Sequence, residues 1–407
     1  MAMLINDHSF HYELHRMLAH ARYRGSDTAE VLELASKIEP GDMESWHGAF
    51  LPLAQRTENS AGAPSKPHQA SRRVTRADRL FAASNYYRAA DFFLHGNPSD
   101  KRIDALWKKQ TECFNEASKE LGNGVRQLLH ADHFDVPIIY FRTSDSTPGP
   151  PTRRPTIILG NGYDGAMEEM MHVSGFAALE REYNVILYEG PGQPAVRRDQ
   201  GLGFIHDWER VVKPVVDFAF AQPDVDATKV ALFGYSFGGI LCVRAAAFEH
   251  RLAAAVAIDG IFDFNCRARL PDFLGEIWDE GKSEEFDSKF SEVAFDPNVP
   301  TEARWGFQQG MWSFNAKSGS DFMKKAEHFT LKDVIDKVHC PVFVGDAEED
   351  LFFKGQPEKI AAALGNKGYH RRFSAAEGAG MHCQVGAAAL MNGEVFDWLE
   401  NTMVVTN

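Results

Sequence analysis

The sequence is poor in cysteine and in basic charge. Its five cysteines are widely spaced and no two form a CxxC pair, which indicates a reducing compartment and argues against a zinc site. Lys and Arg number 43 against 57 Asp and Glu, so the formal net charge is −14. This balance disfavours a general role on nucleic acid or on an anionic membrane. We therefore expect a small-molecule partner, with no nucleic acid and no membrane.

Long apolar runs are also absent. The N-terminus lacks the basic flank and the sustained apolar stretch of a secretory signal. No window approaches the ~20 uninterrupted apolar residues of a membrane span. We therefore expect a cytoplasmic protein. Its 407 residues, of which 44% are hydrophobic and 12% aromatic, are enough for a catalytic core and an accessory domain.

Two regions of the chain differ in their patterns. Residues 1–130 carry mainly helical signals and predict a helical N-terminal domain. Residues 131–407 contain short β-rich runs, most of them separated by helical stretches. Continuous apolar strands that alternate with helices predict a doubly wound, mostly parallel α/β sheet. The predicted strands cover residues 133–141, 156–159, 184–188, 229–233, 253–258, 341–344 and 369–373.

Two long stretches between the predicted strands need a separate interpretation. Residues 144–155 are rich in proline and predict a surface loop. Residues 259–340 show amphipathic patterns, contain no clear strand and precede the penultimate predicted strand. An insertion of that size is either a lid or a set of ordinary core-packing helices, and both interpretations stay open.

One segment has the pattern of a catalytic turn. Residues 229–247 read as an apolar strand, a sharp turn and an Ala-rich helix, with Gly234 and Gly238 two residues on either side of Ser236. The small neighbours let strand and helix approach each other, and the turn lifts the serine hydroxyl out of the sheet. This arrangement predicts Ser236 as a nucleophile. The alternative is a glycine-rich strand-to-helix turn without catalysis.

A serine hydroxyl needs a general base, and with this turn the chain order is serine, acid, histidine. Among the histidines after Ser236, only His382 lies in a loop between the last predicted strand and a closing helix at 385–399. Its glycine-rich surroundings give the backbone freedom to swing the imidazole over the sheet edge. We prefer His382 to the other histidines that follow the serine, which are His250, His328, His339 and His370.

The acid is expected after the penultimate strand, where several carboxylates compete. The chain there reads Gly345-Asp-Ala-Glu-Glu-Asp350. We choose Asp350 because it ends the loop just before a hydrophobic run and can turn back toward His382. Asp346 and Glu349 remain alternatives.

Acyl transfer also needs backbone N–H donors for the developing oxyanion. Phe237, which follows the serine, supplies the first donor. The second is expected from the glycine-rich loop after the strand at 156–159, with Tyr163 as the leading candidate and Asp164 as the alternative. This loop can also be a simple strand-to-helix turn that needs glycine for steric reasons only.

A different class of protein competes at the same loop. Gly160, Gly162 and Gly165 have the spacing GxGxxG, and Glu189 ends the next strand where a ribose-binding acid would lie. The catalytic turn and the late histidine have no role in a dinucleotide domain, so we expect no cofactor and no metal. Candidate substrate-binding residues are Asp164, Tyr235 and Glu189, and further polar residues that could touch substrate are Glu168, Glu169, His206, Asp207, Asp259 and Asp263.

Taken together, these motifs resemble one group of proteins. The segments 160–165, 189–193, 234–239, 346–353 and 379–383 are similar to α/β-hydrolases of the group containing 2,6-dihydroxypseudooxynicotine hydrolase and fungal polyketide-cluster hydrolases, including chain-shortening hydrolases of melanin pathways. The segment from Tyr86 to Pro98 also looks like the N-terminal helical domain of that group. The resemblance runs from about Tyr86 to the C-terminus.

The resemblance implies an α/β-hydrolase fold with a helical cap domain before the sheet. It implies a triad of Ser236, Asp350 and His382, and a homodimer. It also implies attack on a carbonyl of a bulky ketone or polyketide-type secondary metabolite, with cleavage of a carbon–carbon bond. A carboxylesterase or thioesterase with the same triad is the nearest alternative, and non-hydrolytic cyclisation or binding is another.

Overall fold

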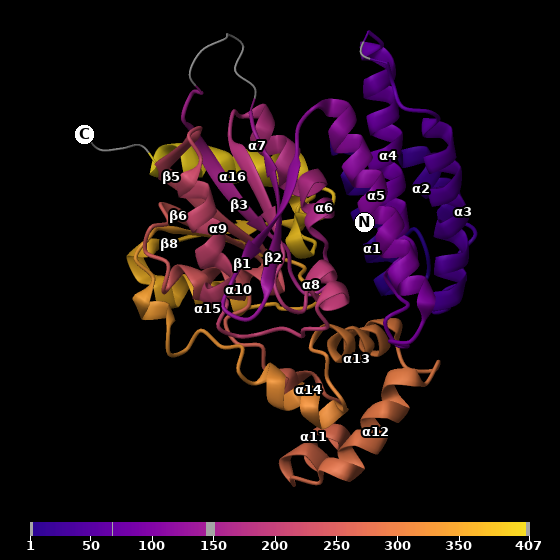
Figure 1. The fold of residues 1–407 in the computed structure, drawn as a ribbon. Helices are drawn as coiled ribbons and strands as arrows, with labels where there is room; N and C mark the ends of the chain where they lie inside the picture. Colours follow the sequence, from indigo (N-terminus) through magenta and orange to yellow (C-terminus); the bar gives the residue numbers. More distant parts are fainter. Residues whose placement is uncertain (1–2, 67, 144–150, 404–407) are drawn as a thin grey trace. The chain divides into compact units, whose positions relative to one another are not determined.

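A computed structural model describes residues 3–66, 68–143 and 151–403. The chain divides into two compact units (Figure 1). Unit 1 comprises Met1–Gly124 and Cys266–Lys325, and unit 2 comprises Val125–Asn265 and Ala326–Asn407. The N-terminal helices and the insertion therefore share one unit, although the first half of the sheet separates them in the sequence. Most of the surface loop predicted over 144–155 falls outside the described residues.

Unit 2 is built on one eight-stranded sheet in the order β1-β2-β4-β3-β5-β6-β7-β8. Strand β2 pairs antiparallel with β1 and β4, and the remaining pairs are parallel. This arrangement confirms the predicted doubly wound, mostly parallel sheet. The strands are β1 Val125–His130, β2 Asp135–Phe141, β3 Arg154–Gly160, β4 Asn184–Tyr188, β5 Val225–Tyr235, β6 Ala254–Ile258, β7 Val342–Ala347 and β8 Gly368–Phe373.

The central strands are buried because helices cover the sheet on both faces. Successive side chains of a strand point to opposite faces. On β5, Phe233 contacts Phe396 of one helix, whereas a side chain at Gly234 would meet Cys242 of another. The helices of unit 2 are α6 Met167–Met170, a π-helical turn Met171–Gly175, α7 Phe176–Glu180, α8 Pro194–Asp199, α9 Glu209–Ala221, α10 Phe237–Ala246, α15 Gln356–Leu364 and α16 Ala388–Thr402.

Strand β1 corrects one prediction, because the sequence patterns predict a helical domain over residues 1–130 and the last six of these residues form a strand. Its residues pair along their whole length with β2, from Val125 opposite Tyr140 to His130 opposite Asp135. Val125 and Leu128 remain largely exposed, so this edge strand shows no clear apolar alternation. Pairing with β2, and not the pattern of the segment itself, makes it a strand.

Unit 1 contains the N-terminal helices around an aromatic core. The Trp46 ring lies 4.9 Å from Phe10 and 4.8 Å from Phe50 between ring centroids, and its indole N–H donates to the Ala89 carbonyl at 2.8 Å. Burial of these large rings stabilises the bundle. Its helices are α1 His8–Ala19, α2 Thr28–Ala35, α3 Met43–Ala61, α4 Ala70–Asp91 and α5 Lys101–Leu121.

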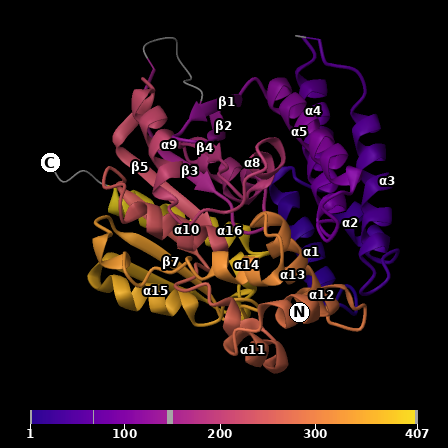
Figure 2. The same ribbon diagram turned by 60° about the horizontal axis from the view of Figure 1, so that its bottom comes forward.

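The insertion completes unit 1 and is helical, as predicted. Phe92 stacks on Trp305 at 5.2 Å, and His95 stacks on Trp312 at 5.0 Å. Helix α13 also contacts α1 (Figure 2). The insertion helices are α11 Asp272–Asp279, α12 Ser283–Phe295, α13 Thr301–Ser313 and α14 Gly319–Ala326. None of the helices in the described residues combines the length and the apolar character needed to cross a membrane.

Candidate active site

Ser236 lies in a strained turn between β5 and α10. Its backbone has φ 55° and ψ −123°, a region that residues with a Cβ rarely adopt and that costs about 1–3 kcal/mol. Two backbone hydrogen bonds hold the turn, one from the Ser236 N–H to the Ile258 carbonyl and one from the Gly239 N–H to the Ser236 carbonyl, each 2.8 Å long. The serine is half-buried. The sharp turn predicted from the sequence is therefore present.

The glycines on either side are required by close approach. A Cβ on Gly234 would lie 1.9 Å from the Gly238 carbonyl oxygen, and a Cβ on Gly238 would lie 2.5 Å from the Asn161 carbonyl oxygen. Neither contact is compatible with a side chain. The two small residues thus let β5, α10 and the loop after β3 meet at the serine.

His382 and Asp350 come together through their side chains. The imidazole Nδ1 lies 2.8 Å from Asp350 Oδ2, and both residues are buried. Asp350 Oδ1 accepts two further hydrogen bonds, from the backbone N–H groups of Phe352 at 2.6 Å and Phe353 at 3.0 Å. These bonds fix the carboxylate, and the carboxylate selects the tautomer that carries its proton on Nδ1. His382 Nε2 is then the nitrogen that can accept a proton.

Charge and burial act against each other in this pair. Burial disfavours the charged imidazole, but the Asp350 charge and hydrogen bond outweigh it and hold the pKa of His382 well above its ordinary value. Burial likewise disfavours the Asp350 carboxylate, yet the His382 charge and the two backbone donors hold its pKa below its ordinary value. The pair is therefore arranged to stabilise an imidazolium next to a carboxylate.

The two alternative acids lie elsewhere. Asp346 is buried on β7, and its Oδ2 lies 3.0 Å from His370 Nε2. Glu349 is exposed, and its backbone N–H donates to the Gly380 carbonyl at 2.8 Å. Of the three acids considered from the sequence, the structure brings Asp350 into hydrogen-bond contact with His382.

Two hydrogen bonds link Ser236 to the neighbour of His382 through residues 258 and 259 of unit 2. Ile258 accepts the Ser236 N–H, and the next residue, Asp259, accepts the Cys383 N–H at 2.5 Å. Ser236 follows β5 and Asp259 follows β6. Both residues therefore lie at the carboxyl ends of parallel strands, where doubly wound folds place their sites. The serine and the histidine therefore belong to one edge of the sheet.

The predicted oxyanion loop also lies against the serine turn. A Cβ on Gly162 would lie 2.6 Å from the Tyr235 carbonyl oxygen and 3.2 Å from the Phe237 nitrogen. The rings of Tyr163 and Phe237 pack at 5.8 Å between centroids. The residues chosen as oxyanion donors are thus neighbours, and their role as donors stays a prediction, as does that of Asp164.

An aromatic cluster surrounds these residues. Phe237 packs against Phe204 at 5.0 Å, Phe264 at 4.9 Å and Phe329 at 5.1 Å between ring centroids. The cluster is completed by Tyr163, and by Phe352 and Phe353, whose rings lie 5.0 and 6.0 Å from the His382 ring. Phe204, Phe264 and Phe329 lie outside the sequence motifs, and only Phe237 and Tyr163 are site residues predicted from the sequence. The surroundings of the candidate site are therefore apolar and aromatic.

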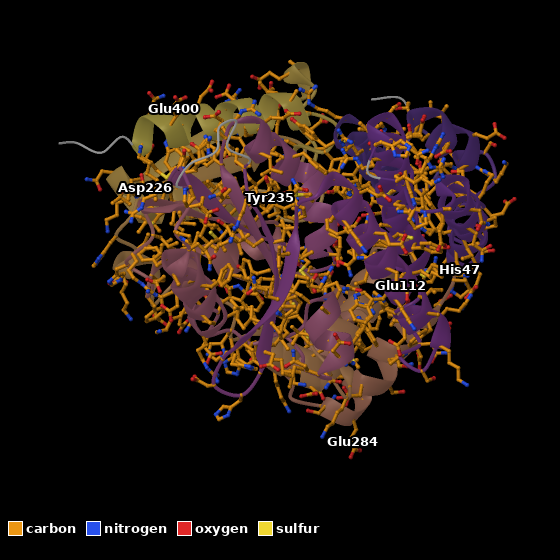
Figure 3. All side chains as sticks on the ribbon, turned by 45° about the horizontal axis from the view of Figure 1, so that its top comes forward. His47, Glu112, Asp226, Tyr235, Glu284 and Glu400 are labelled. Atoms are coloured by element: carbon orange, nitrogen blue, oxygen red, sulfur yellow. The ribbon has the colours of Figure 1, made fainter. Side chains whose placement is uncertain are left out.

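Two predicted substrate-binding residues have partners inside unit 2. The Tyr235 hydroxyl lies 2.5 Å from Ser174 Oγ and contacts the sulfur of Met391. Figure 3 labels Tyr235 among the side chains of the protein. Tyr235 is 4% exposed and Glu189 is 1% exposed. Asp164 is half-buried. Their roles in binding substrate stay predictions.

Glu189 forms hydrogen bonds with the loop that carries the oxyanion candidates. Its Oε1 accepts from the Met167 N–H at 2.8 Å and from Asn161 Nδ2 at 3.2 Å, and its Oε2 accepts from the Ala195 N–H at 2.7 Å. Burial, with the neighbouring Glu168 charge, raises the pKa of Glu189 to about 8. A buried carboxylate engaged in this way does not fit the ribose contact that a dinucleotide-binding site needs.

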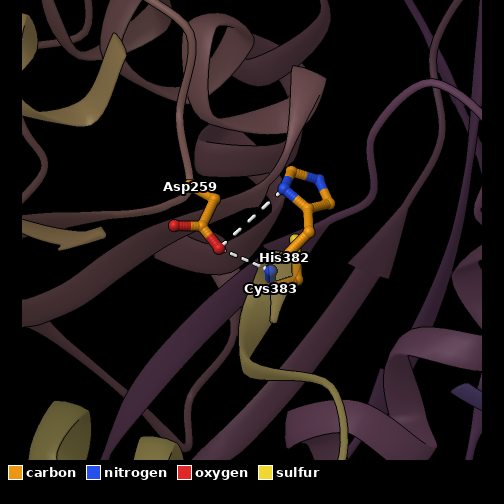
Figure 4. Close-up of side chains that lie close together, drawn as sticks. All are labelled: Asp259, His382 and Cys383. Carbon is orange, nitrogen blue, oxygen red and sulfur yellow. Dashed lines mark hydrogen bonds and ion pairs between the residues drawn. The ribbon is translucent and has the colours of Figure 1, made fainter. Parts of the chain in front are cut away.

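One cluster near the histidine has the donor atoms of a metal site. Asp259, His382 and Cys383 place a carboxylate oxygen, a ring nitrogen and a sulfur within 4.8 Å of one another (Figure 4). It is the one such group of three found in the part of the chain that the structure describes. The His382 nitrogen that faces Asp259 is already bonded to Asp350, so a metal there would compete with that hydrogen bond.

Comparisons with known proteins match the chain to one family. Residues 157–388, more than half of the chain, match the family model described as Alpha/beta hydrolase family. The chain is 30% identical to Hydrolase LUC6 from Fusarium sp, over 97% of this chain and 96% of that protein. It is 28% identical to 20-hydroxy-prefusarin hydrolase FUS2 from Gibberella moniliformis, over 97% of each.

Solved structures show the same fold. The crystal structure of the 2,6-dihydroxy-pseudo-oxynicotine hydrolase matches with a TM-score of 0.71 at 18% identity, over 95% of each chain. A structure of AbyA5 matches with a TM-score of 0.63 at 14% identity, over 93% of this chain and 95% of that one. These matches and the relatives from Fusarium and Gibberella confirm the resemblance predicted from the sequence motifs.

Proposed function

The chain belongs to the alpha/beta hydrolase family and is a hydrolase, and from this premise we propose that Ser236 is its nucleophile. His382 serves as the general base, and Asp350 orients and stabilises its imidazole. The observation that carries the proposal is the 2.8 Å contact of His382 Nδ1 with Asp350. That contact leaves Nε2 to accept the proton of a serine held in a strained turn on the same sheet edge.

The reaction follows from these roles. Ser236 Oγ attacks a substrate carbonyl carbon while its proton passes to His382 Nε2. The backbone N–H groups of Phe237 and Tyr163 stabilise the resulting oxyanion. Collapse of the tetrahedral intermediate expels the leaving group, which takes the proton from His382, and leaves an ester on Ser236. Water, activated by the same histidine, then releases the acid and restores the serine.

We propose a bulky ketone or polyketide-type metabolite as substrate, with a carbon–carbon bond of a β-diketone as the scissile bond. The second carbonyl of a β-diketone makes the expelled carbon an enolate, a much better leaving group than a simple carbanion. The aromatic cluster supports a large apolar substrate, because such rings bury flat apolar surface favourably. The names of two similar proteins, which mention 20-hydroxy-prefusarin and 2,6-dihydroxy-pseudo-oxynicotine, support a small organic substrate.

The test uses three model substrates of matched size in water enriched in ¹⁸O: an aryl β-diketone, the corresponding aryl ester and the corresponding thioester. Cleavage of the diketone to an acid and a methyl ketone, with one ¹⁸O in the acid, supports the proposal. Turnover of the esters alone identifies a carboxylesterase or thioesterase. A rearranged product without ¹⁸O identifies non-hydrolytic cyclisation. Loss of all turnover in Ser236→Ala is expected for each hydrolytic route.

A further inference from the structure

Asp259 directly follows β6 and has no role in the chemistry above. It is fully buried and has a left-handed backbone, with φ 46°. Its Oδ1 accepts the Ala347 N–H at 2.7 Å, and its Oδ2 accepts the Cys383 N–H at 2.5 Å and Gln384 Nε2 at 3.0 Å. One carboxylate therefore joins the end of β7 to the loop that carries His382.

That loop needs an anchor because its backbone is strained. Cys383 and Gln384, the two residues after His382, both have positive φ values, 55° and 49°. Residues with a Cβ rarely adopt this region, and two in succession are rarer still. Both residues donate a hydrogen bond to Asp259. The hydrogen bonds to the carboxylate thus offset the backbone strain in the two residues that directly follow His382.

Asp259 also places a charge beside the imidazole. Its Oδ2 lies 3.9 Å from His382 Nδ1, the same nitrogen that bonds Asp350 at 2.8 Å (Figure 4). The two acids follow neighbouring parallel strands, β6 and β7, whose carboxyl ends meet at one sheet edge. Two carboxylates from separate strands therefore face a single ring nitrogen.

We propose that Asp259 is a positioning residue for His382, which fixes the backbone of residues 382–384 and adds a second negative charge beside Nδ1. The proposal rests on the proposed function for its effect on turnover, since only a catalytic His382 would transmit it. The titratable groups around Asp259 are His382, Asp350 and Cys383. Its three hydrogen-bond partners are all N–H donors, which favours the ionised carboxylate.

The charge of Asp259 depends on pH. Burial raises the pKa of Asp259 to about 7, while the His382 charge and the backbone donors act in the opposite direction. The pKa of His382 lies well above its ordinary value. The N–H donors around Asp259 favour its ionised form, so replacing the carboxylate with a neutral amide is expected to change the titration of the imidazole.

The test follows the titration of His382 by NMR in protein labelled with ¹³C at the histidine rings. The His382 signal is identified by its loss in His382→Gln. In Asp259→Asn, a folded protein is expected to show a His382 midpoint lower by roughly one unit, because an opposite charge within ~4–6 Å has been removed. Asp346→Asn is the control, since it neutralises a buried acid that contacts His370. An unchanged midpoint in folded Asp259→Asn overturns the proposal.

A second variant decides the matter if Asp259→Asn does not fold. Asp350→Ala removes the closer carboxylate and leaves Asp259 in place. Burial without a carboxylate lowers the pKa of a histidine. A His382 midpoint at or above about 6.5, the ordinary histidine value, therefore supports a charge from Asp259. A midpoint clearly below that value contradicts it.

A fluorophosphonate that labels active serines separates this proposal from the proposed function. If the wild-type protein is not labelled at Ser236, the proposed function fails, and the NMR titration still decides the role of Asp259. If it is labelled, the acidic limb of the labelling rate is expected at lower pH in Asp259→Asn, by the shift seen in the titration. A rate that falls equally at every pH, with the limb unmoved, contradicts the charge effect.

Discussion

Replacement of Asp350 by asparagine removes one charge at nearly constant shape, and its effect can be worked out from the contacts of the carboxylate. Oδ1 of Asp350 accepts the N–H groups of Phe352 and Phe353, and an asparagine oxygen can keep both bonds. Its Nδ2 then occupies the place of Oδ2, 2.8 Å from His382 Nδ1. Because that amide donates, the histidine must carry its proton on Nε2 instead of Nδ1.

A histidine protonated on Nε2 cannot take the proton of Ser236. An acid-to-amide change of this kind in a serine–histidine–aspartate site lowers the rate by about 10⁴-fold, which corresponds to about 5.5 kcal/mol of lost transition-state stabilisation. The assay is kcat/KM on an activated ester, or the fluorophosphonate labelling rate, for Asp350→Asn and for the control Asp346→Asn. Folded Asp350→Asn protein within tenfold of wild type would refute the assignment of Asp350, as would an equal loss in the control.

Three further predictions follow from the same contacts. Gly238→Ala places a Cβ 2.5 Å from the Asn161 carbonyl, so we expect a loss of about 100-fold or more in kcat/KM from the displaced loop. Gly393→Ala, at an open helical position, is the control and should change stability by no more than about 1 kcal/mol; equal activity in the two variants would contradict the packing argument. Because burial raises the pKa of Glu189 from 4.5 to about 8, the stability it contributes is fully present below its unfolded pKa and is lost as pH rises toward 8. Urea unfolding at about pH 5 and about pH 8.5 should show a loss of stability in wild type that is larger than in Glu189→Gln by on the order of 4 kcal/mol, and identical losses would rule out Glu189 as the titrating group. Dialysis against EDTA should leave activity unchanged, since His382 Nδ1 is bonded to Asp350; a loss restored by Zn²⁺ would instead indicate a metal at Asp259, His382 and Cys383.

The central sheet and the serine turn could be predicted because local sequence encodes both. Apolar runs such as 229–233 become buried strands, and glycines beside Ser236 are needed wherever strand and helix approach this closely. Strand β1 could not be predicted in this way, since exposed Val125 and Leu128 give no alternation and the strand depends on pairing with β2. Its formation is set by a tertiary contact.

The candidate site could be predicted only in part from the sequence, for a similar reason. His382 could be chosen because of the loop in which it lies. Asp350 was one of several acids in the same loop, and their spacing in the sequence does not determine which of them contacts the imidazole. Asp259 was named only as a residue that could touch substrate, because its contacts with residues 383 and 384 bridge more than one hundred positions. The oxyanion roles of Phe237 and Tyr163, the lid role of the insertion and the homodimer stay predictions.

The identity of the nucleophile is the claim on which the rest depends. Reaction with a fluorophosphonate followed by peptide mass mapping tests it without knowledge of the substrate. The account predicts a single modified residue, Ser236, with labelling abolished in Ser236→Ala and strongly slowed in His382→Gln. Modification of a different residue, or full turnover by folded Ser236→Ala, would contradict it.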